Sequence, residues 1–494
     1  MQYQNIENYS PKKSKLRVII AITLAVLHLS VFTGLIACIG VNSRTELGQG
    51  RIIFTGELER GARIRVLEND TAIAQGFFSE LIAAFNAEYA SYNIQAIDAN
   101  QGNFLDLEQA GPFGFGPCVL FQANDRIMRF AEGGHIFALP IEQLDTFEYV
   151  GDKAWNAFFM YAYEIVLDEN NRPVMDGEQP LRHRVPSTFG APVMIQGPVI
   201  YYRRSLVDPE VLTTWANIYQ FNRDRATANP AHRGYIRSMI DPYFNFGYLL
   251  SYGAYIFAEN NTDPSRIGLS QNGAERGANV HRQLASSMDN RVVDHSLTPL
   301  VYEQLARGIF AATMTTPDVY TLFIDALMRN GFSREEAVAE LGVAPMPKLP
   351  LCGDLRNPDA ELIPSIMMGG INGYAISAYT PYPNAALAFI NFATSFRSIQ
   401  RRHELLGIAP AREDVAEEVG GISLIINEEL AEGNIFVMPS IRAMTQVWGP
   451  VEAFFADLAQ DAFRSRPLLQ TQTQQLQRLA QLDTTIYNAI WTFA

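Results

Sequence analysis

Apolar and polar residues alternate in blocks that predict strands and helices in turn. Residues 64–67, Ile-Arg-Val-Leu, read as a strand, followed by a polar loop over 68–71. A helix is predicted over 78–85, where apolar side chains recur at i, i+3, i+4 and i+7. Two more segments, 93–97 and the apolar run 117–121, read as strands. Strands and helices that alternate in this way predict a parallel sheet covered by helices.

Polar side chains directly follow two of these predicted strands. Asp70 comes after the first strand, and Asn124, Asp125 and Arg126 come after the third. Ligands of open α/β sheets bind at the carboxyl ends of the strands. These four residues are therefore the first candidates for a binding site.

The later chain repeats the α/β pattern after an interruption. Ile165 to Arg184 resembles an inserted hairpin with Asn170-Asn171 as its turn. A second α/β pattern runs from Val199 to about Leu341, and a proline-rich connector follows over 345–353. Three further segments carry apolar stripes at helical spacing and are interpreted as core faces: 386–393, 451–458 and 479–490.

The N-terminus has the order of a secretory signal. Basic residues precede an apolar run that starts at Val18 and continues with few polar breaks to Ala37. The run could also be a membrane helix, since its length approaches the roughly 20 residues that span a bilayer. Its end, Leu35-Ile36-Ala37-Cys38, resembles a bacterial lipobox, which implies cleavage before a diacylated Cys38. We therefore expect a lipoprotein signal peptide over 1–37 and a tether over 38–61.

Charge and cysteine content narrow the possible partners. The 494-residue chain has a formal net charge of −14, and the basic leader makes the remainder more acidic still. Nucleic acid is therefore not an expected partner, because phosphate binding requires clustered cations. Besides Cys38, the chain has Cys118, predicted to be buried, and Cys352; a disulfide between these two stays open.

Sequence motifs of many enzyme classes are absent. The seven histidines are scattered and no cysteine pair has metal-ligand spacing, so neither a metal nor a cofactor is expected. The chain has no GxxxxGK[ST] loop, no GxGxxG ahead of a helix and no GxSxG elbow. Glycosidases leave no local motif, so Asp70 and Asp125 stay open as an acid and base pair. Their polar surroundings, with Arg126 near, predict that both carboxyls stay ionised, which argues against that role.

Sugar binding would require hydrogen-bonding side chains and flat aromatic rings that cover the C–H faces of a pyranose. The candidates for hydrogen bonding are Asp70, Asn124, Asp125, Arg126 and Gln196. The candidates for aromatic platforms are Tyr243, Phe244 and Trp448. Each residue alone is more often an ordinary surface or core residue, so the hypothesis requires them to lie together.

Six segments, in order, resemble the maltose/maltodextrin-binding proteins and related extracellular solute-binding proteins. The most specific is Gly116 to Arg126, which resembles the family's strand end and its Asp-Arg ligand loop. The others are Val193–Ser205, Asp241–Phe244, Arg307–Thr313, Gly407–Arg412 and Met444–Trp448. The resemblance covers about residues 62–465 and implies a substrate-binding subunit of an ABC importer, which is not an enzyme. Such a subunit would deliver a captured oligosaccharide to permease subunits and their ATPase. We expect a monomer on the extracytoplasmic face of the membrane.

The resemblance also implies an α/β, two-lobed periplasmic-binding-protein-like fold, each lobe a mostly parallel sheet flanked by helices, with a hinge between them. The first lobe is expected over 62–195 and 343–406, and the second over 196–342 and 412–494. Asp70, Asn124, Asp125 and Arg126 would be hydrogen-bonding groups of the first lobe. The second lobe would supply Tyr243, Phe244 and Trp448, and Asp318 is added as a ligand contact.

Departures from the family pattern put the α-glucan specificity in doubt. Gln122 stands where maltose binders carry a tryptophan, and Gln196 stands where they carry a glutamate. Asp318 follows Thr316-Pro317 where the family has a Gly-Pro-Trp turn, and no lysine follows Asp70. A shorter or different oligosaccharide is therefore plausible as the ligand. Two competing functions stay open: a lipid-anchored glycoside hydrolase, and the same fold binding a peptide or another solute or acting as a sensor.

Overall fold

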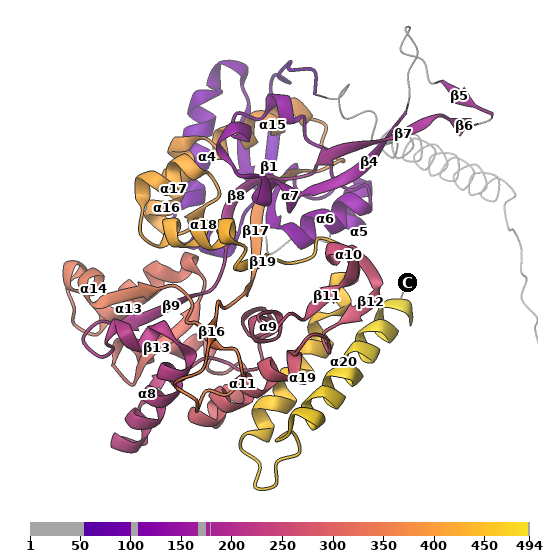
Figure 1. The fold of residues 1–494 in the computed structure, drawn as a ribbon. Helices are drawn as coiled ribbons and strands as arrows, with labels where there is room; N and C mark the ends of the chain where they lie inside the picture. The colour runs from indigo at the N-terminus through magenta and orange to yellow at the C-terminus, as the bar shows by residue number, and fades with distance from the viewer. Residues whose placement is uncertain (1–53, 100–106, 166–173, 178, 493–494) are drawn as a thin grey trace, which may run out of the picture.

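The computed structural model describes residues 54–99, 107–165, 174–177 and 179–492. The predicted signal peptide, Cys38 and most of the tether lie outside these residues, as does the predicted turn at Asn170-Asn171. The chain forms two lobes, seen one above the other in Figure 1. Among the described residues, no helix has the length and apolar character needed to cross a membrane.

The first lobe is built on a seven-stranded mixed sheet. Its order is β18-β8-β17-β3-β1-β2, with β19 pairing with β17. The strands are β1 (Arg63–Leu67), β2 (Gln95–Asp98), β3 (Val119–Ala123), β8 (Ala191–Gln196), β17 (Met367–Ile376), β18 (Ala409–Pro410) and β19 (Ile435–Val437). The helices around it are α4 (Phe77–Glu88), α6 (Asn124–Glu132), α15 (Pro383–Ala393), α16 (Phe396–Leu406), α17 (Glu413–Val419) and α18 (Ile422–Glu432). The predicted early strands and helix are thus present, displaced by a few residues.

The second lobe has a four-stranded sheet in the order β10-β13-β9-β14. Its strands are β9 (Val199–Arg203), β10 (Arg233–Tyr235), β13 (Phe310–Thr315) and β14 (Leu341–Ala344). Its main helices are α8 (Trp215–Ala228), α9 (Pro242–Leu250), α11 (Ala274–Ser287), α12 (Val301–Ala306), α13 (Tyr320–Arg329), α14 (Arg334–Glu340), α19 (Trp448–Asp461) and α20 (Gln472–Thr492). The lower helices α9, α11, α19 and α20 enclose an apolar cluster that includes Phe246, Phe454 and Phe455.

Both sheets contain antiparallel pairs, so they are more mixed than the sequence predicted. In the first sheet β1 runs parallel to β2 and β3, but β17 is antiparallel to β3 and β8. In the second sheet β9 is antiparallel to both of its neighbours. The reason is that the antiparallel strands are those that connect the lobes. β8 leads out of the first lobe into β9, and β17 returns from the second lobe into the first.

The chain crosses between the lobes three times, after β8, before β17 and after β19. The crossings are closely packed at Gly369, where a methyl group would lie 2.6 Å from the Gln196 carbonyl oxygen and 2.3 Å from Ile435 Cγ2. Another glycine, Gly247 of α9, lets that helix approach to the Ile366 carbonyl, 2.6 Å from where a methyl group would stand. Helix α9 is thus placed directly on the strand that joins the lobes.

The pairing of the strands corrects two predicted lobe boundaries. β14 pairs with β9, and the short β15 (Leu349–Pro350) pairs with β16 (Leu362–Ile363) beside α8, so residues 343–363 belong to the second lobe. Helices α17 and α18 contact β18 and β8, so residues 413–437 belong to the first lobe. The proline-rich connector suggested a boundary, but the chain returns only at β17.

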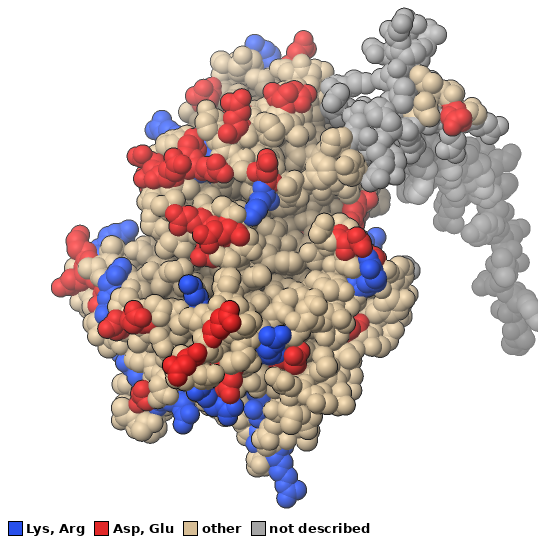
Figure 2. Space-filling view, in the orientation of Figure 1, with Lys and Arg blue, Asp and Glu red and all other residues tan. Residues whose placement is uncertain are grey.

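An antiparallel hairpin projects from the first lobe, as the sequence predicted. β4 (Phe159–Ile165) pairs with β7 (Arg182–Thr188), and β5 (Met175–Asp176) pairs with β6 (Gln179–Pro180) farther out (Figure 1). The two described cysteines are both free; Cys118 is buried in the first lobe and Cys352 is exposed in the second. Acidic side chains dominate the upper lobe in Figure 2, whereas Lys and Arg gather at the lower end of the other lobe.

Candidate functional site

The turn from β3 into α6 carries three of the predicted residues. Asn124 is buried, and its Nδ2 donates to the Met438 carbonyl at 3.1 Å and to Ser440 Oγ at 2.6 Å. Its Oδ1 accepts a hydrogen bond from the Ile371 N–H at 3.1 Å. The amide therefore ties α6 to two of the strands that join the lobes, and its donors are already used within the protein.

Asp125 and Arg126 follow in the first turn of the same helix. Arg126 is exposed, whereas Asp125 is half-buried. Burial raises the pKa of the Asp125 carboxyl, against the opposing effects of backbone N–H groups and of the Arg126 charge. The polar surroundings were expected to keep this pKa from rising, and that expectation is wrong in direction because burial is the larger effect.

The turn after β1 places Asp70 at the surface. Asn69 caps the short helix α3 (Asp70–Ala74) by accepting from the Ala72 N–H at 2.7 Å, and Asp70 is exposed. The preceding residue, Glu68, is fully buried and pairs with Arg402 of α16, with Oε1 2.7 Å from Nη2. The Tyr374 hydroxyl donates to the same carboxylate.

Nothing in the sequence indicated this Glu68–Arg402–Tyr374 network. Its members are far apart along the chain, and Glu68 and Arg402 lie in polar stretches that do not distinguish them from exposed residues. Arg402 also lies over the Phe121 ring, with its Cζ atom 4.0 Å from the ring centroid. The network ties the carboxyl end of β1 to α16 and β17, and so fixes the loop that carries Asp70.

On the second lobe, Asp318 lies in the turn that follows β13. It lies in the 3₁₀ turn η10 (Pro317–Val319), held by the buried Tyr201 hydroxyl, which donates to the Pro317 carbonyl at 3.0 Å. Among the described residues, the buried Asp318 Oδ1 atom has no hydrogen-bond partner. Burial raises the pKa of this carboxyl, only partly offset by Thr316 and by the Arg402 charge.

The hydroxyl of Tyr243 is affected by charged groups of both lobes. The Asp241 carboxylate caps α9 by accepting from the Tyr243 N–H at 3.1 Å, and this cap orients the first turn. The Tyr243 hydroxyl is buried without a partner among the described residues. Its pKa is raised first by burial and then by the negative charges of Asp318, Asp241 and Asp125. A carboxyl of each lobe therefore lies near the same free hydroxyl.

The remaining two predicted platforms differ from each other. Phe244 packs edge-on against Tyr243, but Arg237 covers one face of its ring, with Cζ 3.5 Å from the centroid. Trp448 opens α19, is half-buried and lies edge-on to Phe246, with centroids 6.3 Å apart. The 3₁₀ turn η11 (Arg442–Gln446), just before Trp448, contacts α6. Asp125 and Trp448 are therefore linked through neighbouring elements.

Gln196 is the last residue of β8, half-buried at the first crossing between the lobes and paired with Gly370 in register. The structure thus brings Asp125, Tyr243 and Asp318 together, with Gln196 and Trp448 on the adjoining elements. Asp70 and Arg126 are exposed, and Asn124 is engaged within the protein. The described residues offer no group of three His, Cys, Asp or Glu placed to hold a metal ion.

A cavity of about 600 Å³ also lies between the lobes, away from these residues. Tyr320 and Arg334 line it from the second lobe, and His403, Gly407 and Ile422 line it from the first. None of the predicted site residues contributes to its wall, so this cavity is separate from the predicted binding residues.

Comparison with known proteins bears on the family and the fold of the chain. A family model described as bacterial extracellular solute-binding protein matches residues 80–424. The maltodextrin-binding protein MdxE of Bacillus subtilis is 22% identical over 407 residues, which cover 79% of this chain and 84% of that protein. A maltooligosaccharide ABC transporter solute-binding lipoprotein of Streptococcus pneumoniae R6 is 23% identical over 280 residues, 54% of this chain and 60% of the relative.

Solved structures of the same kind share the fold. The maltose-binding periplasmic protein MalE of Listeria monocytogenes, in complex with maltose, has a TM-score of 0.64 at 18% identity, covering 88% of this chain and 99% of that chain. MalX of Streptococcus pneumoniae, in complex with maltopentaose, has a TM-score of 0.63 at 18% identity, with coverages of 86% and 99%. The predicted two-lobed α/β fold is confirmed.

Proposed function

Because this chain belongs to the bacterial extracellular solute-binding proteins, we propose that it is the substrate-binding subunit of an ABC importer and that its ligand is an oligosaccharide. Its relatives in Bacillus and Streptococcus are named for maltodextrin and maltooligosaccharides, which supports a ligand of that class. The permease and ATPase subunits of the importer would be its partners, and the chain itself would act as a monomer.

The observation that carries this proposal is the buried hydroxyl of Tyr243, which has no hydrogen-bond partner among the described residues and whose pKa is raised by carboxyls of both lobes. Asp125 comes from the first lobe and Asp318 from the second, and neither carboxyl has an ion-pair partner among the described residues. Sugar hydroxyls would donate to both carboxylates and accept from Tyr243. Such a ligand gains contacts only when both lobes reach it, which is what drives closure about a hinge.

The composition of the site favours hydrogen bonding over aromatic stacking. Gln122 and Asp318 occupy positions where the resemblance leads one to expect tryptophan, and Arg237 covers one face of Phe244. Trp448 is then the main platform for a pyranose face. A ligand of few sugar units, held by several charge-assisted hydrogen bonds, fits such a site better than a long glucan chain.

A glycoside hydrolase has one observation in its favour and two against it. The raised pKa of Asp125 suits a general acid. Its supposed partner Asp70 is exposed at the surface, however, and the family is one of binding proteins. We therefore propose a protein that binds sugar without cleaving it.

The membrane location rests on the N-terminal sequence. The lipobox-like residues 35–38 and the lipoprotein named among the relatives support a diacylated Cys38 and an extracytoplasmic location. Two acyl chains hold a protein on a bilayer far more firmly than one.

Intrinsic fluorescence and thermal stability would test the sugar-binding proposal together. Maltose, maltotriose and longer maltodextrins should raise the melting temperature of the mature protein without release of reducing ends. Trp448→Ala should weaken binding at least tenfold, since loss of an aromatic contact with its buried area costs roughly 1.5–3 kcal/mol. Trp491→Ala, at an exposed position near the end of α20, is the matched control and should leave affinity unchanged.

The outcomes separate the competing functions. Turnover of the sugar would favour the hydrolase, and lack of response to any sugar would favour another solute. Equal affinities of the Trp448→Ala and Trp491→Ala variants would remove Trp448 from the site.

A further inference from the structure

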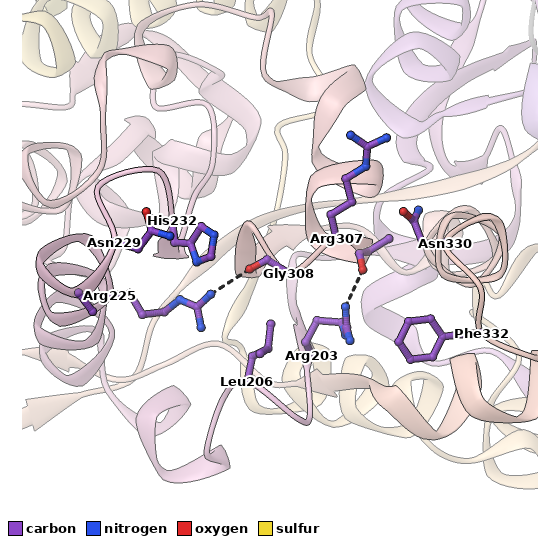
Figure 3. A pocket seen from close by; sticks show the side chains of 11 residues that line it. Arg203, Leu206, Arg225, Asn229, His232, Arg307, Gly308, Asn330 and Phe332 are labelled. Atoms are coloured by element: carbon purple, nitrogen blue, oxygen red, sulfur yellow. Dashed lines mark hydrogen bonds between the residues drawn. The ribbon is translucent and has the colours of Figure 1, made fainter.

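A cationic pocket of about 700 Å³ lies on the second lobe at the opposite end of its sheet from the candidate sugar site (Figure 3). Its walls come from the end of β9, the end of α8 and the turn between α12 and β13. Asp318 lies in the turn after the end of β13, whereas Gly308 of the pocket lies in the turn before its start. The strand length therefore separates the two sites.

Among the described residues, Arg225 is the arginine of this pocket that has no carboxylate partner. One of its terminal nitrogens donates to the Gly308 carbonyl at 2.9 Å, and its buried Nε has no hydrogen-bond partner within the described part of the chain. Burial lowers the pKa of the guanidinium, and no carboxylate contributes to offset this. A half-buried charge without a counter-ion is costly, and a bound anion would remove that cost.

The neighbouring cations differ from Arg225 because each has a carboxylate. Arg203 pairs with Glu340 at 2.5 Å, and Arg307 pairs with Glu303 at 3.1 Å. The ring of His232 lies beside the Arg225 guanidinium in Figure 3, on the same side of the pocket as the Gly308 carbonyl. The local charge is therefore positive on a chain whose total is strongly negative.

Part of the wall is apolar. Leu206 lies between Arg225 and Arg203 in Figure 3, and Ala228, Ala306 and Phe332 add apolar surface, whereas Asn229 and Asn330 are polar. The volume is far larger than a bare inorganic ion requires. A ligand with a charged head and a carbon body fits both the cationic and the apolar wall.

We propose that this pocket binds an organic phosphate, with the phosphate group on Arg225 and His232 and the carbon body against Leu206 and Ala228. Arg225 has one terminal nitrogen, Nη1, that makes no hydrogen bond among the described residues, and His232 adds a ring N–H. A phosphate dianion has enough oxygen atoms to accept from both, and such charge-assisted hydrogen bonds are among the strongest in proteins. The site is independent of the sugar site.

Calorimetric titration with phenyl phosphate, at constant ionic strength, tests the proposal on the mature protein. The wild type should show saturable binding, and phenol, which has the same ring without the charge, should not bind. Arg225→Gln should weaken binding at least tenfold, and His232→Gln several-fold. Arg223→Gln changes an exposed arginine of the same helix and is the matched control, with unchanged affinity.

Two results would overturn the proposal: no saturable binding of phenyl phosphate by the wild type, or an equal loss in Arg223→Gln. If Arg225→Gln does not fold, the comparison of His232→Gln with Arg223→Gln decides. The affinity of Arg225→Gln for maltotriose should equal that of the wild type, so failure of the phosphate site is distinguishable from failure of the sugar site.

Discussion

Replacement of Arg402 by methionine should be one of the most destabilising single changes in the first lobe. The Arg402 side chain is 1% exposed and the Glu68 side chain is fully buried. In the variant the carboxylate keeps only the Tyr374 hydroxyl and the Asn69 N–H as partners. A buried negative charge is then left without its counter-charge, which costs about 3–5 kcal/mol.

This loss is a large part of the roughly 5–15 kcal/mol that stabilises a typical domain. Urea denaturation followed by circular dichroism would measure it as a lower midpoint of the unfolding transition. Glu68→Gln combined with Arg402→Met removes both charges, so the double variant should be more stable than the sum of the single losses predicts. We expect a coupling free energy of about 2–3 kcal/mol from this double-mutant cycle.

The adjacent Arg401 supplies a matched control. It belongs to the same helix, pairs with Glu80 at 2.8 Å and with Glu404 at 2.9 Å, but is exposed. Because water already solvates exposed ion pairs, Arg401→Met should change stability little. Equal losses in the Arg401 and Arg402 variants, or strictly additive losses in the cycle, would refute the reasoning.

Buried ionisable groups, a close glycine contact and the lipobox cysteine each predict a measurable effect. Asp318→Asn should raise the melting temperature at pH 7 but weaken sugar binding. Burial raises the pKa of this carboxyl, so its ionised form opposes folding and the stability of the wild type falls as pH rises above about 4 through the folded pKa. A lower melting temperature of the variant would contradict this. Burial lowers the pKa of His281 to about 4, so the unfolded chain binds the proton first and stability falls as pH drops below about 6.5. Between pH 7 and pH 5 the wild type should lose about 2 kcal/mol more stability than His281→Gln, measured by urea denaturation at both pH values. Equal losses in the two proteins would contradict this prediction. Gly369→Ala should destabilise by about 1–3 kcal/mol because its methyl group overlaps the Gln196 carbonyl, whereas Gly449→Ala, with open space around it in α19, should not destabilise. Cys38→Ala should release the protein from membranes on fractionation, and continued attachment would mean that residues 18–35 form an uncleaved helix.

The elements that the sequence predicted best are those with strong local patterns. The strand at 64–67 and the helix at 78–85 appear as β1 and α4 because alternating blocks and helical spacing are local properties. The polar residues after β3 were predicted as site candidates because ligands of open α/β sheets bind at the carboxyl ends of the strands. The connector at 345–353 misled the lobe assignment, because proline content does not show which sheet a segment pairs with.

The candidate site could be predicted only in part. Asp125, Tyr243 and Asp318 were named from sequence, but their common neighbourhood depends on how three crossings bring the lobes together. Asn124 was predicted as a ligand contact, whereas in the structure its amide bonds to Met438 and Ser440. That role could not be predicted, because the two partners are more than three hundred positions later in the chain.

The position of β17 has a consequence for biogenesis. This strand lies in the middle of the first sheet, between β3 and β8, but begins only at Met367. The first sheet therefore lacks a central strand until about three quarters of the chain has been synthesised, and its completion depends on contacts of very long sequence separation. The first lobe therefore cannot complete its sheet while the earlier part of the chain emerges, which leaves that lobe in a state that a secretion channel could thread.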